Sequence, residues 1–165
     1  MIFWVPVLAY VAVVLLAGAG YAFHPAPRPR HLLAHLLLRY VNLIPVGLMG
    51  LWGAVGHLMF PARTAAAIGW APSPFQTEVG YANLGLGIAG VLAAVLPDRG
   101  FRAGVAVVVA GFLGGAAANH VVEIVRDGNL AVGNAGPILY TDVLTPLLLF
   151  ILLAVTWRSA RTGPA

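Results

Sequence analysis

The chain has 165 residues, 61% of them apolar and only 8% charged, far from the roughly 25% charged residues of a soluble globular domain. Its net charge of +4 comes from nine arginines without any lysine, and these are scattered singly or in small groups, so no nucleic-acid interface is expected. Cysteine is absent, which excludes disulfides, thiolate metal sites and thiol catalysis. The composition indicates an integral membrane protein whose main partner is the lipid bilayer.

Five segments are apolar over about the 20 residues that a transmembrane helix needs. They are residues 2–23, 41–60, 77–97, 102–124 and 137–157. The first segment lacks a preceding basic region and is too long for the apolar part of a signal peptide, so we expect it to remain as a helix. The predicted fold class is all-α: a polytopic transmembrane helical bundle of five spans, or four if the first segment does not span, in a single domain of residues 1–165.

The connection between the first two spans has two parts. Residues 24–30 contain a proline at every second position from Pro25 to Pro29, which excludes a helix because each proline also restricts the residue before it. Residues 31–40 follow, with His31 and His35 on one side of a helix and leucines on the other. This pattern predicts an amphipathic helix lying in the membrane interface.

Arginines are concentrated on one side of the membrane if all five segments span. The residues on that side are Arg28, Arg30, Arg39, Arg99, Arg102, Arg158 and Arg161. Only Arg63 and Arg126 are on the other side. Because positive residues accumulate in cytoplasmic connections, the sequence predicts a multi-pass protein of the cell (inner or plasma) membrane with Met1 outside and Ala165 in the cytoplasm.

Polar side chains gather near the predicted outer ends of the spans. The polar cluster expected there consists of Glu78, Asn83, Asn119, His120, Glu123 and Asp142. His57, at the end of the second span, falls in the same slice of the bilayer. Ionisable groups inside spans are costly and usually functional, so this layer is the candidate site.

Two chemical functions of this layer stay open. Imidazole and carboxylate groups suit a divalent metal ion such as zinc, iron or manganese, and the same groups are sufficient for a proton relay. The candidate metal ligands are His57, Glu78, His120, Glu123 and Asp142. We expect at least three of these five side chains to lie within hydrogen-bond or shared-ligand reach. An enzyme or a transporter could be built in this way, but the sequence assigns no reaction and no catalytic residue.

Small residues form stripes on three of the predicted spans. These stripes are Gly47, Gly50 and Ala54; Asn83, Gly87, Gly90 and Ala94; and Gly111 and Gly115. Such stripes let a neighbouring helix approach closely. They support a hypothesis of a different class, an accessory or structural subunit of a homo-oligomer or a larger membrane complex, in which the polar layer only holds helices together.

A resemblance rests on residues 73–85, on His120, on residues 133–137 and on Asp142. These residues resemble a family of small bacterial and archaeal integral membrane proteins of unknown function, over roughly residues 45–155. The resemblance implies a helical membrane bundle whose polar positions match Glu78, Asn83, His120, Asn134 and Asp142. It implies no activity, and the first span and the proline-rich connector lie outside it.

Overall fold

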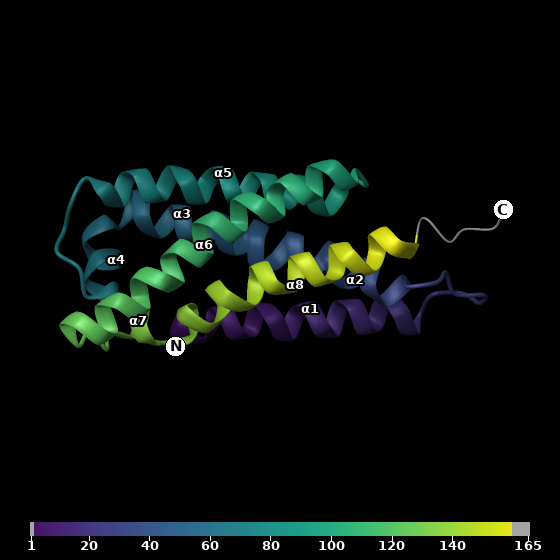
Figure 1. Ribbon diagram of the computed structural model, residues 1–165, viewed down its shortest axis with the longest axis horizontal. Helices are drawn as coiled ribbons and strands as arrows, with labels where there is room; N and C mark the ends of the chain where they lie inside the picture. The colour runs from purple at the N-terminus through teal and green to yellow at the C-terminus, as the bar shows by residue number, and fades with distance from the viewer. Residues whose placement is uncertain (1, 160–165) are drawn as a thin grey trace.

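The computed structural model describes residues 2–159 of the chain, and most of them are helical. Five long helices run along the bundle (Figure 1). They are α1 (Val5–Ala22), a continuous helix from Leu32 to Met59, α5 (Phe75–Val95), α6 (Arg99–Asp127) and α8 (Pro137–Ser159). All five are long and apolar enough to cross a membrane. The predicted all-α bundle with five candidate spans is therefore confirmed.

The second long helix changes its winding in the middle. It begins as α2 (Leu32–Val41), widens into the π-helical segment η2 (Asn42–Leu48) and continues as α3 (Met49–Met59). Pro45 lies inside η2; because proline has no amide hydrogen and its ring crowds the preceding turn, a wider turn relieves the conflict. The predicted boundary at residue 41 is absent, since the expected interfacial helix of residues 31–40 runs directly into the second span.

The amphipathic pattern of this segment has a cause other than the membrane interface. α2 packs against α1 and α8. Leu38 and Val41 are each only 1% exposed and belong to the hydrophobic core. The apolar face of α2 therefore meets the rest of the protein, which produces the same spacing of leucines as a membrane surface would.

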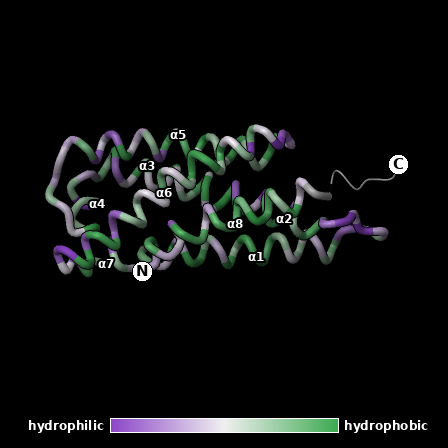
Figure 2. The backbone as a smooth tube through the Cα atoms, viewed as in Figure 1, coloured by the Kyte–Doolittle hydropathy of each residue, from purple (hydrophilic) through white to green (hydrophobic). Residues whose placement is uncertain are grey.

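The two ends of the bundle differ in chemistry. One end carries α4 (Pro61–Ile68), α7 (Val132–Ala135) and the start of α1, and we call it the α4/α7 end (Figure 1). The other end, the arginine-rich end, carries the connection after α1 and the turn between α5 and α6, with Arg28, Arg30, Arg39, Arg99 and Arg102. Hydrophilic residues gather at both ends, and the helices between them are mostly hydrophobic (Figure 2). Arg161 lies outside the described residues, as do both chain ends used in the predicted orientation.

The hydrophobic core is built mainly by α1, α2, α6 and α8. Its buried residues are Val13, Leu38, Val41, Val46, Ala93, Val105, Ala106, Val109, Leu149, Leu152 and Leu153. Other large apolar side chains, such as Leu8, Val108 and Phe150, are exposed on the outside of the bundle. An apolar exterior of this kind is suited to contact with lipid.

Glycines determine how closely α3 and α5 pack. A Cβ atom on Gly87 would lie 2.6 Å from the Leu51 backbone nitrogen, and one on Gly90 would lie 2.5 Å from the Gly47 nitrogen. The small-residue stripes predicted on the second and third spans are thus in mutual contact. On α6 the outcome is different, because a Cβ atom on Gly111 or Gly115 would meet nothing within 4 Å. That stripe is not used for packing within the described chain.

Candidate functional site

A tight reversal of the chain after α6 places Asn134 beside His120. α6 ends at Asp127, and the next residue, Gly128, has a left-handed φ of 64°, which glycine adopts without strain. The Asn129 side chain then accepts a hydrogen bond from the Ala131 amide at 3.1 Å, which forms a local turn. The short helix α7 follows and carries Asn134 into the interior, where its side chain is fully buried.

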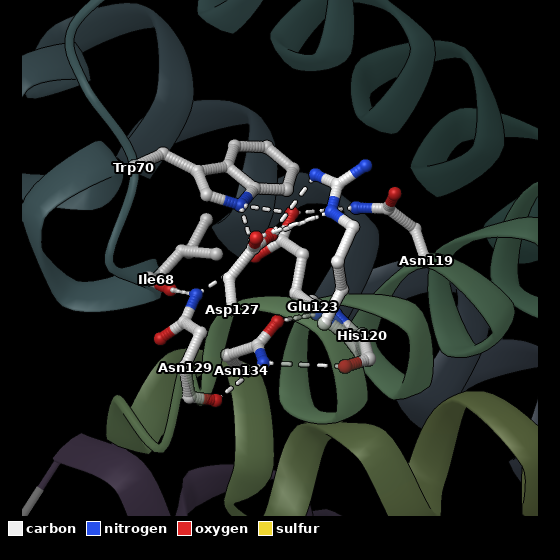
Figure 3. A network of polar contacts seen from close by, with 9 residues as sticks. Ile68, Trp70, Asn119, His120, Glu123, Asp127, Asn129 and Asn134 are labelled. Carbon is white, nitrogen blue, oxygen red and sulfur yellow. Dashed lines mark hydrogen bonds and ion pairs between the residues drawn. The ribbon is translucent and has the colours of Figure 1, made fainter.

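The amide group of Asn134 is held in one orientation (Figure 3). Its Nδ2 donates to the carbonyl oxygen of Asn129 at 2.8 Å and to that of His120 at 3.3 Å. Its Oδ1 therefore faces the His120 ring, 2.6 Å from Nδ1. Because an amide oxygen only accepts hydrogen bonds, Nδ1 of His120 carries the proton and donates it to Asn134.

The other ring nitrogen of His120 faces a buried carboxylate. Nε2 of His120 lies 3.8 Å from Oδ2 of Asp142, which α8 contributes from the neighbouring helix. The two residues are only 6% and 5% exposed. A distance of 3.8 Å exceeds that of a hydrogen bond, but it is within the range over which the two charges interact strongly in a medium of low dielectric constant. The two groups therefore face each other as a close pair without a direct hydrogen bond.

A hydroxyl pair continues this polar column deeper into the bundle. Thr145 is buried one turn after Asp142 on α8, so the two residues share a helix face. The Thr145 hydroxyl donates to the Thr141 carbonyl at 2.6 Å, so the Tyr10 hydroxyl, also at 2.6 Å, donates to Thr145. The column of His120, Asn134, Asp142, Thr145 and Tyr10 joins α1, α6, α7 and α8.

Glu123 is the centre of a second group of hydrogen bonds at the surface of the α4/α7 end, which Asn129 joins to Asn134 (Figure 3). Its carboxylate accepts hydrogen bonds from Trp70 Nε1 at 2.7 and 2.8 Å, from Asn119 Nδ2 at 2.9 Å and from Asn129 Nδ2 at 2.7 Å. Asn129 also donates to the Ile68 carbonyl at 2.9 Å. The carboxylate thus fastens α4 and the residues that follow it to the end of α6.

The remaining candidates lie on the α3–α5 side. Nδ1 of His57 is 2.7 Å from Oε1 of Gln76, and the two residues link the end of α3 to the start of α5. Glu78 is exposed and makes no polar contact with the described residues. Asn83 donates to the Val79 carbonyl of its own helix at 2.9 Å, and its side chain fills the space left by Gly53.

The structure brings only two of the five candidate metal ligands together, namely His120 and Asp142. Within residues 2–159 no three histidine or acidic side chains are grouped so that they could hold a metal ion. The reason lies in the pairing of helices. α3 packs mainly on α5, and α6 packs mainly on α8, so residues at one depth are divided between two parts of the bundle.

Five participants were not among the predicted site residues, and they are Tyr10, Gln76, Trp70, Asn129 and Thr145. Tyr10 and Thr145 form the inner part of the polar column, and Trp70 donates a hydrogen bond to the Glu123 carboxylate. A hydroxyl within the apolar first span was a usable signal for Tyr10, because a buried tyrosine hydroxyl needs a partner. Trp70 gave no such signal, since tryptophan near a span end is common at membrane interfaces.

A family model matches residues 3–162, which is nearly the whole chain. The chain belongs to DUF6790, a family of unknown function. The DUF6790 match includes the first span and the proline-rich connector, so it corrects the expectation that these two segments lie outside the family. No curated protein and no solved structure matches the chain.

Proposed function

We propose that this DUF6790 protein binds and relays protons through the His120–Asp142 pair, as a single-domain membrane protein. The observation that carries this proposal is the 3.8 Å approach of two buried titratable groups with Nδ1 of the imidazole already committed to Asn134. Only Nε2 is then left to exchange a proton, and Asp142 is the acidic group that faces it. Histidine and carboxylate chains of this type are the usual proton carriers inside membrane proteins.

The extent of the polar column supports proton exchange with the solvent at one end of the bundle. The column begins beside the α6–α7 connection and ends at the Tyr10–Thr145 pair. Beyond this pair, Val13 on α1 and Leu149 on α8 belong to the hydrophobic core, and the buried Thr156 near the end of α8 donates its hydroxyl hydrogen to carbonyls of its own helix. Protons would thus enter and leave at the α4/α7 end, and the apolar core would prevent conduction through the chain.

A metal-binding site is the weaker alternative, because the ligand set is not gathered among the described residues. An accessory or structural subunit is the second candidate function, and a specific observation favours it. Gly111 and Gly115 leave an open strip on α6, which a helix of another copy or of a larger complex would fill. In that case the polar column would serve only to hold α1, α6 and α8 together.

Infrared spectroscopy during a pH titration tests the proton-binding proposal on the purified protein. We expect a carboxyl band that is lost in Asp142→Asn and whose midpoint moves by on the order of one pH unit in His120→Gln, because a neighbouring charge is removed. Glu78→Gln is the matched control, since that carboxylate is at the same end but exposed.

The alternatives give different results in the same experiment. A midpoint that is unchanged in His120→Gln would show that the two groups are uncoupled, and the accessory-subunit function would replace ours. A carboxyl band that changes on addition of a chelator would favour a bound metal ion, because a cation keeps its carboxylate ligands ionised.

We further propose that the α4/α7 end faces outside the cell membrane and the arginine-rich end faces the cytoplasm. The distribution of Arg28, Arg30, Arg39, Arg99 and Arg102 against Arg63 and Arg126 supports this orientation. A reporter enzyme that works only in the cytoplasm, fused after Ala165, is expected to be active. If only a reporter that needs the outer compartment were active after Ala165, the proposed orientation would be wrong.

A further inference from the structure

A small cavity opens at the arginine-rich end, far from the His120–Asp142 pair. Its volume is about 220 Å³, which is less than the roughly 300–1,000 Å³ of pockets that take drug-sized ligands. α2, α6, α8 and the turn between α5 and α6 form its walls. The lining residues are His35, Leu38, Pro97, Arg99, Arg102, Leu153, Thr156 and Trp157.

The cavity combines an apolar base with a basic wall. Leu38 and Leu153 are buried residues of the hydrophobic core, whereas Arg99, Arg102 and His35 supply nitrogen donors. Nε of Arg102 donates to the Ala93 carbonyl at 2.7 Å, which fixes the guanidinium group in place. A guanidinium held in this way loses little conformational freedom when it binds an anion.

Positive charge in this region is not balanced by the described residues. Arg39 and Asp98 are close enough to Arg102 to interact with it electrostatically. Asp98 already accepts a hydrogen bond from the Phe101 amide as the N-cap of α6. Within residues 2–159 none of Arg39, Arg99 and Arg102 forms an ion pair. Asp98 is thus the one acidic group that acts on Arg102 among the described residues, and Arg99 and Arg102 line the cavity.

We propose that this cavity binds a phosphate group through Arg99 and Arg102, with His35 as a further donor. Arginine forks match the oxygens of phosphate, and the resulting hydrogen bonds are charge-assisted. The phosphate group could be carried by an anionic lipid or be free in solution. An apolar base beside the basic wall fits a lipid, and Trp157 beside the cavity is a residue type common at the lipid–water boundary.

Two binding measurements on the full chain in detergent distinguish these sources. Native mass spectrometry with dioleoyl phosphatidylglycerol measures the lipid, and equilibrium dialysis with radiolabelled inorganic phosphate measures the free anion. Binding of the lipid alone identifies a headgroup site. Binding of inorganic phosphate that competes with the lipid identifies a site for the free anion, and both results support the proposal.

Single substitutions test whether the cavity is the site. Arg99→Gln and Arg102→Gln are each expected to raise the Kd by about tenfold or more, because each removes a hydrogen bond between charged groups. Arg30→Gln is the matched control in the exposed connector at the same end, and it should change the Kd by less than about fivefold, the effect of one surface arginine. Circular dichroism verifies that each variant is folded. Arg99 is exposed, so Arg99→Gln tests the site without removing the hydrogen bond between Arg102 and the Ala93 carbonyl.

The proposal is overturned if neither probe binds to the wild-type chain. It is equally overturned if Arg99→Gln and Arg102→Gln bind the lipid and the anion as the wild type does, or if Arg30→Gln weakens binding as much as they do. In the last case the affinity would come from the general positive charge of this end. None of these outcomes affects the proposed role of His120 and Asp142.

Discussion

Replacement of Gly87 by alanine is expected to destabilise the bundle by about 3 kcal/mol, the upper part of the usual range for overpacked interiors. The new Cβ atom would lie 2.6 Å from the Leu51 backbone nitrogen and 3.0 Å from the Gly47 carbonyl oxygen. Both are backbone atoms, so no side-chain rotation relieves the clash. α3 and α5 must move apart, and they lose contacts along their whole interface. Chemical unfolding in detergent micelles measures the change in the free energy of unfolding.

Gly85→Ala is the matched control, since it makes the same substitution on the same helix. A Cβ atom on Gly85 meets nothing within 4 Å. We expect the variant to be as stable as the wild type or more stable by up to about 1 kcal/mol, because alanine favours the helix over glycine. If Gly87→Ala unfolded at the same denaturant concentration as Gly85→Ala, the close contact between α3 and α5 would be contradicted.

Asn134→Ala is expected to have an effect of similar size. The substitution removes the acceptor for the His120 ring hydrogen and both donors to the carbonyl oxygens of Asn129 and His120. Each buried polar group that loses its partner costs about 1–3 kcal/mol, so we expect a loss of roughly 3 kcal/mol in the free energy of unfolding. We also expect the infrared bands of the His120 ring to change, because nothing then fixes its Nδ1 hydrogen.

Asn119→Ala provides the comparison for this prediction. Asn119 is exposed and makes a single hydrogen bond to Glu123. Loss of one such bond should cost less than about 1.5 kcal/mol and leave the His120 ring bands unchanged. Equal stabilities of the two variants would mean that Asn134 does not hold the His120 ring as described.

The five spans could be predicted because hydropathy reports directly which segments suit lipid. The expected spans 77–97, 102–124 and 137–157 overlap α5, α6 and α8 almost completely. The boundary near residue 41 could not be predicted, because a helix face buried against protein and one lying on a membrane have the same spacing of leucines. The π-helical turn around Pro45 also lets the helix pass a residue that normally marks a break.

The sequence predicted where along each span the polar residues lie, but it did not predict which of them lie next to each other. Their positions near the ends of the predicted spans put His57, Glu78, Glu123 and Asp142 in one expected layer, and of these four Asp142 forms a close pair with His120. The reason is that position and periodicity describe each helix separately, whereas a site depends on which helices pack together. The glycine stripes show the same limit, since those of α3 and α5 meet while that of α6 faces outward.

The depth of Asp142 within α8 has an electrical consequence. Asp142 is five residues after the first residue of α8, or about 7–8 Å along the helix axis. That is about a quarter of the roughly 30 Å hydrocarbon thickness. A proton that reaches Asp142 would cross a similar fraction of the transmembrane voltage, so its binding free energy would change by about 0.6 kcal/mol for each 100 mV. The occupancy of this carboxylate would then respond weakly to membrane potential as well as to pH.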